Sequence, residues 1–287
     1  MPELTATFDP ALVQVVSNDS NKITASFHAI EQWTSSFDKT YYRSNARIAH
    51  SETADAMQAT LAERIQAGIS TFQTLQGRRI SEHLTDLIPL LNTRRLYGAA
   101  LTTRALIEVT ATVVYYQTEV TRMLVEGIKT QTQMDELGVL LEKSVRGSRF
   151  DWARWLASDA TRRELTKAFA DKEKITVEIE QVNVLTMIKR LGKHFTEERS
   201  ENDGLIDLAY GLLSDICHPS AGANLLQLAN KPTDGWWIVQ PEVTDDLMRW
   251  YCLNTTIPLV QTIAQAAATS LTALTRTASS IHTASST

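Results

Sequence analysis

The sequence predicts an all-α protein, and three observations lead to that prediction. The chain of 287 residues contains only 11 Gly and 7 Pro, so it has few turn formers for its length. Its hydrophobic share of 43%, against 21% charged residues, is sufficient to bury a core. Apolar residues recur at three- and four-residue intervals along most of the chain, which is the period of an α-helix. We therefore expect a single helical domain over residues 21–275.

The first half of the chain is expected to form four helices after a flexible start. Residues 1–20 show no apolar period, which predicts a flexible N-terminus. The first helix is marked by Ile23, Phe27, Ile30 and Trp33. A longer stripe over 54–72 predicts a helix that stops at Gly77, and residues 80–91 follow as a separate helix. Residues 96–128 keep apolar residues at helical spacing and should be the strongest, central helix.

The second half is expected to add further helices over 134–145, 160–170, 177–195 and 205–218. The connector SRFDWARWLAS carries Trp152 and Trp155, and ERSENDG is expected to be an exposed loop. Turn residues bracket the segment WWIV in KPTDGWWIVQPEV, which predicts a small extended, hairpin-like excursion at Trp236 and Trp237. A long helix should then run from 242 to 275, before a flexible Ser/Thr/Ala-rich tail over 276–287.

One segment of the chain has the length of a membrane span. Residues 252–275 contain no charged side chain and are long enough to cross a bilayer. They also contain many Thr, Ser and Gln residues, and their apolar residues fall on one helical stripe. This pattern is typical of an amphipathic helix packed on a soluble core, so we expect no membrane partner.

Charge and cysteine content further restrict the classes of protein to which the chain can belong. The net charge of −5 and a pI near 5.7 argue against a surface built throughout for nucleic acid, although a local basic groove is compatible with this average. Cys217 and Cys252 form neither a CxxC pair nor a spaced framework, which argues against a disulfide scaffold and a cysteine-rich metal site. The N-terminal segment lacks the apolar core of a signal peptide. We expect a cytoplasmic protein.

Polar residues on apolar helices are the candidates for chemistry, because the chain lacks GxxxxGK[ST], GxGxxG, HExxH and GxSxG motifs. Arg104 and Glu108 lie one turn apart on the central helix, and burying either charge alone would be strongly unfavourable. Later in the chain, Tyr210, Ser214 and His218 follow at four-residue intervals on one helix face, just before Pro219. We expect the two helices to meet and to place all five side chains together.

These five residues allow two interpretations. In the first, Arg104 and Glu108 form a structural ion pair, while Tyr210, Ser214 and His218 satisfy caps and buried backbone groups. In the second, they converge on one cleft and supply a phosphate-binding guanidinium, a proton-transferring imidazole and neutral donors that orient both. A cleft open to solvent at His218 would favour the second interpretation, and full burial the first.

The segments TTRALIEVTATVVYY and YGLLSDICHPSAGAN carry a resemblance to known proteins. They match the pattern Arg-x-x-x-Glu followed later by Tyr-x-x-Leu-Ser-x-x-x-His-Pro, through Arg104, Glu108, Tyr210, Leu213, Ser214, His218 and Pro219. This pattern resembles a poorly characterised family of bacterial helical proteins that is similar to the HEPN superfamily. That superfamily consists of helical bundles and includes metal-independent ribonucleases of toxin–antitoxin and phage-defence systems. The resemblance covers about residues 90 to 230.

The resemblance implies an HEPN-like bundle with extra helices and an RNA-directed role. His218 would act as general base on the ribose 2′-hydroxyl, Arg104 would stabilise the phosphorane charge, and Glu108 and Tyr210 would position them, with no metal or cofactor. HEPN ribonucleases carry an Arg that is separated from the His by four to six residues, and this chain lacks it at His218, so only Arg104 could replace it. The resemblance also implies a homodimer, with an antitoxin or second subunit as a further possible partner. The alternative is a non-catalytic interaction or regulatory protein, whose Trp-rich surfaces meet a partner.

A second basic group lies on the 177–195 segment. Lys189, Arg190 and Lys193 could contact phosphate, and Arg190 precedes His194 with a spacing one residue short of the HEPN pattern. A solvated helix face explains the same charges.

Overall fold

The computed structural model describes residues 6–18, 20–42, 61–125, 131–146, 158–170, 183–198, 205–218 and 243–284. Every regular element in these ranges is helical, so the predicted all-α fold is confirmed. The expected Trp-rich excursion at Trp236 and Trp237 and the connector with Trp152 and Trp155 lie outside the described residues.

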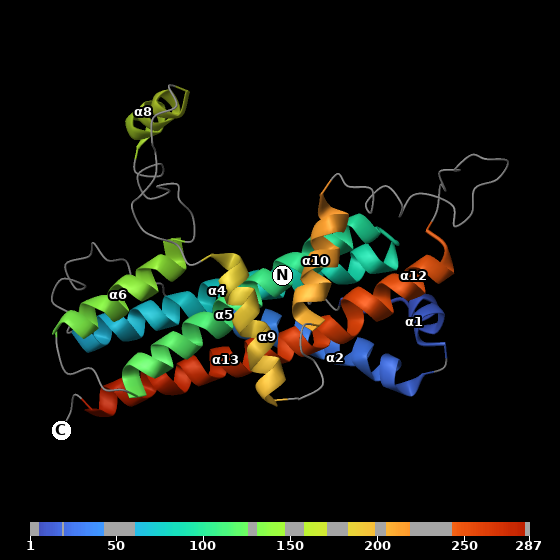
Figure 1. Ribbon diagram of the computed structural model, residues 1–287, viewed down its shortest axis with the longest axis horizontal. Helices are drawn as coiled ribbons and strands as arrows, with labels where there is room; N and C mark the ends of the chain where they lie inside the picture. The colour runs from blue at the N-terminus through green and yellow to red at the C-terminus, as the bar shows by residue number, and fades with distance from the viewer. Residues whose placement is uncertain are drawn as a thin grey trace.

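Three long helices form the centre of the protein: α4 (Leu61–Asn92), α5 (Leu96–Val125) and α13 (Ile257–Ala284). They lie side by side along the long axis of the molecule (Figure 1). Helix α2 (Asn21–Phe37) packs on α13 and α4, and α6 (Gln131–Arg146) packs on α4. Apolar side chains fill the space between the central helices, among them Leu84, Leu87, Leu106, Ile107, Val113, Ile263 and Leu271.

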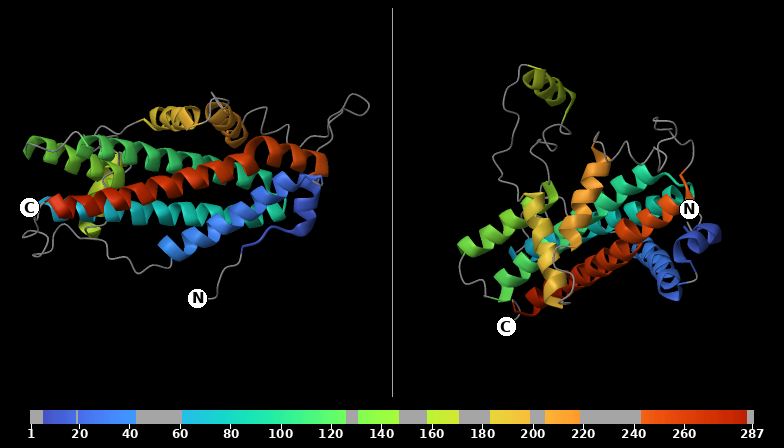
Figure 2. Two further views of the ribbon diagram at one scale, coloured as in Figure 1. Left: turned by 90° about the horizontal axis from the view of Figure 1, so that it is seen from below. Right: turned by 45° about the vertical axis from the view of Figure 1, so that its right-hand side comes forward.

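Two shorter helices, α9 (Val184–Glu198) and α10 (Leu205–Cys217), lie across one face of α5 (Figure 2). At one end of the bundle, α1 (Pro10–Ser17) packs against α2 and against α12 (Asp245–Tyr251). Helix α8 (Asp159–Ala170) stands apart from the bundle in Figure 1. Helix α5 therefore has two kinds of surface, one buried against α4 and α13 and one that meets α9 and α10.

Two contacts define how α4 and α5 are aligned. The rings of Phe72 and Tyr116 lie 5.4 Å apart. Near the other end of the pair, Leu90 packs so closely over Gly98 that an added Cβ would meet Leu90 Cδ2 at 2.9 Å. Both contacts fit one antiparallel register, in which each step forward along α4 corresponds to one step back along α5.

The expectation of a flexible N-terminus over residues 1–20 is wrong for α1. Asp9 caps this helix by accepting a 2.8 Å hydrogen bond from the backbone of Ala11, and Pro10 begins it. Leu12 and Val16 are buried. The helix is too short to show a clear apolar period in the sequence, and it is held by tertiary contacts with α2 and α12.

The sequence suggested that a helix stops at Gly77, and this prediction is wrong. Helix α4 continues through Gly77 from Leu61 to Asn92. The ring of Tyr41 lies on the backbone of α4 at this position, and an added Cβ on Gly77 would be 2.3 Å from Tyr41 Cγ. Residues 61–72 and 80–91 therefore belong to one helix. The glycine allows a close approach between a helix and a ring.

The C-terminal helix also differs from its expected form. It extends to Ala284, and Ala278 is buried, so the predicted flexible tail over 276–287 is wrong for the residues before 285. Between α12 and α13, a π-helical segment, η2 (Cys252–Thr256), interrupts the α-helical hydrogen bonding. Pro258 follows it and has no N–H to donate to Asn254, which accounts for a change of geometry at this place.

By length and composition, Asp245–Ala278 could cross a bilayer, and 56% of its most apolar window is buried inside the protein. Core helices of soluble proteins meet the same test. The absence of a membrane partner stays a prediction.

Candidate functional site

The residues predicted to meet do so between α5 and α10. Arg104 Nε donates to Glu108 Oε1 at 3.1 Å, and Arg104 Nη2 donates to the Tyr210 hydroxyl at 3.2 Å. The Tyr210 hydroxyl in turn donates to Glu108 Oε1 at 2.8 Å. The guanidinium carbon also lies 5.2 Å from the centre of the Tyr210 ring. The prediction that Arg104 and Glu108 contact the 210–218 helix is confirmed. We call these three residues the Arg104 cluster.

The Arg104 cluster is open to solvent on one side. The side chains of Arg104 and Glu108 are 25% and 35% exposed, whereas Tyr210 is largely buried. Burial alone would lower the pKa of Arg104, but its contacts with Tyr210 and Glu108 outweigh burial and raise that pKa. Burial, together with the hydrogen bond to Glu108, raises the pKa of Tyr210. At neutral pH the guanidinium of the cluster is therefore a cation and its phenol is neutral.

The other two predicted residues lie nearby without joining the cluster. The Ser214 hydroxyl donates to the carbonyl of Tyr210 at 2.7 Å, within its own helix. His218 is exposed at the end of α10, where its backbone N–H donates to the Ser214 carbonyl at 3.0 Å. Its ring makes no hydrogen bond or ion pair with another described residue. His218 is therefore not buried, which removes the outcome that would have favoured the structural interpretation.

Further residues that the sequence did not single out surround the cluster. The Tyr97 hydroxyl donates to the carbonyl of Cys217 at 2.8 Å and so ties the end of α10 to α5. The Cys217 thiol lies beside Arg104, and burial raises the pKa of that thiol. Tyr97, Leu101, Arg104 and Glu108 follow each other at three- and four-residue intervals and form one strip along α5.

Tyr97 and Leu101 are 48% and 46% exposed, so the strip is an open surface with both apolar and charged groups. Two surface pockets of the described residues lie elsewhere. One of about 540 Å³ is bounded by α1 and α2, and one of about 440 Å³ by α5 and α6.

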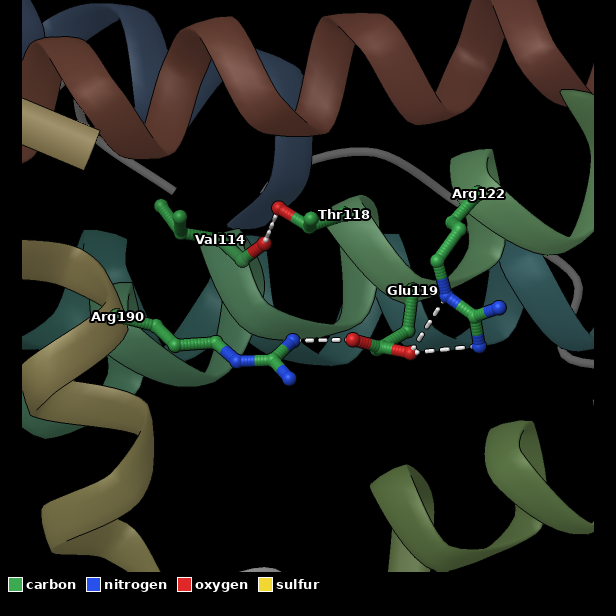
Figure 3. A network of polar contacts seen from close by, with 5 residues as sticks. All are labelled: Val114, Thr118, Glu119, Arg122 and Arg190. Atoms are coloured by element: carbon green, nitrogen blue, oxygen red, sulfur yellow. Dashed lines mark hydrogen bonds and ion pairs between the residues drawn. The ribbon is translucent and has the colours of Figure 1, made fainter. Parts of the chain in front are cut away.

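A second polar network joins α5 to α9 (Figure 3). The Glu119 carboxylate accepts hydrogen bonds from Arg190 and, at 3.1 Å, from Arg122 Nη2. Burial works to raise the pKa of Glu119, but the two arginines outweigh it and leave that pKa below its ordinary value. The guanidinium of Arg190 also stacks 4.7 Å from the centre of the Tyr115 ring.

This network changes the interpretation of the basic group on α9. Arg190 is the central member of the group. Its guanidinium is paired with the Glu119 carboxylate and stacked on the Tyr115 ring within the protein. Lys189 and Lys193 are exposed on the same helix. The ring of His194 packs 5.8 Å from that of Phe195, beside the core. These contacts favour a structural role for Arg190.

The described residues show no candidate metal site, and comparisons with other proteins indicate no family for the chain. In the described ranges, no group of three or more His, Cys, Asp or Glu side chains is placed to hold a metal ion. Comparison with protein-family models, with curated proteins and with solved structures finds no match. The resemblance to HEPN proteins therefore rests on the matching residues alone.

One histidine near the Arg104 cluster was not identified as a candidate from the sequence. His83, on α4, is half-buried and interacts electrostatically with Glu108. In the sequence it stands among Arg79, Glu82 and Asp86, a pattern typical of a solvated helix face. Only the pairing of α4 with α5 could have drawn attention to it.

Proposed function

We propose that the Arg104 cluster is the active centre of an HEPN-like, metal-independent endoribonuclease with a toxin or phage-defence role in the cytoplasm. The observation that carries the proposal is the contact among Arg104, Glu108 and Tyr210 at an open surface, formed by two helices whose motifs lie about a hundred residues apart in the sequence. A homodimer, and an antitoxin or second subunit, belong to the same proposal through the resemblance.

The chemistry of the cluster suits a phosphodiester. Arginine carries five N–H donors, and the contacts with Glu108 and Tyr210 use only two of them. The remaining donors can bind the oxygens of a phosphate, whose negative charge increases in the transition state of cleavage. Glu108 and Tyr210 hold the guanidinium in place.

RNA is the favoured substrate because its own 2′-hydroxyl can attack the phosphorus once an imidazole removes its proton. The motif assigns that proton transfer to His218. Tyr97, exposed on the same strip, offers a ring on which an unpaired base can stack. Single-stranded RNA is therefore the substrate to test first.

A second candidate function is a non-catalytic interaction or regulatory protein. The observation that favours it is that Arg104, Glu108 and Tyr210 satisfy each other across α5 and α10. Such a closed set of contacts also serves to tie two helices together, independently of any substrate.

The test is incubation of the purified protein with total RNA in the presence of EDTA. The wild-type protein should cleave RNA, and Arg104→Ala should reduce the rate by about 10²-fold or more, since it removes the group that stabilises the transition-state charge. Arg122→Ala is the matched control, because Arg122 lies on the same helix but contacts Glu119 instead of the cluster. It should cleave RNA at the wild-type rate.

The melting temperature of each variant separates the two candidate functions. A wild-type protein that leaves RNA intact, together with an Arg104→Ala variant that melts at a lower temperature, would refute the ribonuclease. That result would support the structural role of the cluster.

A further inference from the structure

We propose that His83 on α4, rather than His218, is the imidazole that accepts the ribose 2′ proton, with Glu108 orienting its ring. This inference rests on the proposed ribonuclease function and assigns one of its catalytic groups.

The alignment of α4 and α5 places His83 beside the Arg104 cluster. His83 lies eleven residues after Phe72 and seven before Leu90, which are close to three and two full helical turns. It therefore shares the face of α4 from which Phe72 contacts Tyr116 and Leu90 contacts Gly98. The register of these contacts puts His83 opposite residue 105.

Position 105 is an alanine, which leaves room for an imidazole to pass over it. Glu108 is three residues further along α5, about 4.5 Å along the helix axis at 1.5 Å per residue. A histidine side chain can cover that separation. His83 and Tyr210 thus approach Glu108 from two different helices, α4 and α10.

The hydrogen bonds of Glu108 leave one of its oxygens for His83. Both Arg104 and Tyr210 donate to Oε1, whereas Oε2 accepts no hydrogen bond from any described side chain, His83 included. An imidazole N–H that turned to donate to Oε2 would be fixed in one tautomer, with the second ring nitrogen unprotonated. This is the arrangement in which a carboxylate prepares a histidine to act as a base.

The surroundings of His83 keep its ring neutral. Its charged neighbours among the described residues are Arg79, Glu82 and Asp86 on α4 and Glu108 on α5. Burial, followed by the charge of Arg79, lowers the pKa of His83, and the three carboxylates oppose this change without cancelling it. At pH 7 the imidazole is therefore neutral and able to accept a proton.

His218 is less suited to the same role. It lies at the end of α10 that is tied to Tyr97, and Tyr97 is about 12 Å from residue 105 along α5. No described carboxylate or carbonyl holds the His218 ring in one tautomer. His218 is thus at the end of the exposed strip, while His83 is beside the carboxylate of the cluster.

The proposed reaction is an internal transfer within the RNA. His83 accepts the proton of the 2′-hydroxyl, and the 2′-oxygen forms a bond to phosphorus while the bond from phosphorus to the 5′-oxygen breaks. The 5′-oxygen takes a proton from water, and His83 returns its proton to solvent. The products are a 2′,3′-cyclic phosphate and a 5′-hydroxyl, with Arg104 bound to the phosphate oxygens throughout.

The experiment compares three histidine variants in the RNA cleavage assay with EDTA. His83→Gln should lower the rate by about 10²-fold or more while the protein remains folded. His218→Ala should lower the rate by a smaller factor than His83→Gln does. His28→Gln is the control, because His28 is exposed on α2 and paired with Glu31, away from the cluster. It should cleave RNA as the wild type does.

The pH dependence gives a readout that a merely structural histidine would not change. Because the Glu108 carboxylate favours the charged form of His83, Glu108→Gln should lower the pKa of the His83 ring, measured by an NMR titration. The acid side of the residual rate profile should move to lower pH by the same amount. An unchanged ring pKa would refute the electrostatic interaction between the two side chains.

The remaining outcomes identify which proposal fails. Full activity in His83→Gln together with loss in His218→Ala would overturn this inference and leave the ribonuclease in place. A wild-type protein without activity would overturn both.

Discussion

The packing of Tyr41 on Gly77 predicts that alanine at this position destabilises the protein, although alanine is the better helix former. In an ordinary helix interior, Gly→Ala stabilises by about 1 kcal/mol. At Gly77 the new Cβ would lie 2.3 Å from Tyr41 Cγ, which is more than about 1 Å inside the usual separation of two carbon atoms. The ring or the helix must move.

The size of the effect follows from how firmly the Tyr41 ring is held. It packs 5.7 Å from the ring of Phe37, and Arg78 Nε donates to the Tyr41 carbonyl at 3.1 Å. Overpacking of this kind costs about 1–3 kcal/mol. After the gain in helix propensity is subtracted, Gly77→Ala should lower the free energy of unfolding by up to about 2 kcal/mol.

Chemical denaturation of four variants tests the prediction. Gly138→Ala on α6 is the matched control, because an added Cβ there meets no atom within 4 Å, and it should stabilise by about 0.5–1 kcal/mol. In a Tyr41→Ala background the contact is absent, and Gly77→Ala should become stabilising. If Gly77→Ala stabilises the otherwise unchanged protein as Gly138→Ala does, the reasoning is refuted.

Two further predictions concern buried and paired polar groups. Tyr251 is fully buried, and its hydroxyl lies near Thr103, Thr255 and Thr256 but meets the geometry of a hydrogen bond with no described residue. Tyr251→Phe should therefore raise the free energy of unfolding by about 1 kcal/mol; a decrease would show that one of these threonines satisfies the hydroxyl. Arg190 and Arg122 hold the pKa of Glu119 below its ordinary value. The ionised Glu119 therefore stabilises the folded protein above about pH 4.3, and this stabilisation is lost as the pH falls through the lowered folded-state pKa. Glu119→Gln should therefore lower stability at pH 7 but weaken its fall in acid, as measured by urea denaturation between pH 3 and 7, and an unchanged acid dependence would contradict the network.

The helical class and the meeting of two motifs could be predicted from the sequence because both depend on local rules. The three- and four-residue spacing of apolar side chains is retained wherever a helix buries one face. Arg104 and Glu108 were expected to contact the 210–218 helix, since two charges on an apolar helix require polar neighbours, and Tyr210 supplies them. Such requirements can be derived without knowing the tertiary structure.

The tertiary structure decided the features that depend on which distant segments touch. Gly77 resembles a helix end in the sequence, and only the ring of Tyr41 shows that it is a place of close packing within a continuous helix. His83 resembles a surface residue until α4 is aligned with α5, which places it beside Glu108. The sequence by itself determined that this chain is helical and that the charges on its central helix require polar partners, because spacing and charge are local properties. The role open to a glycine or a histidine depends instead on the neighbour that folding brings to it.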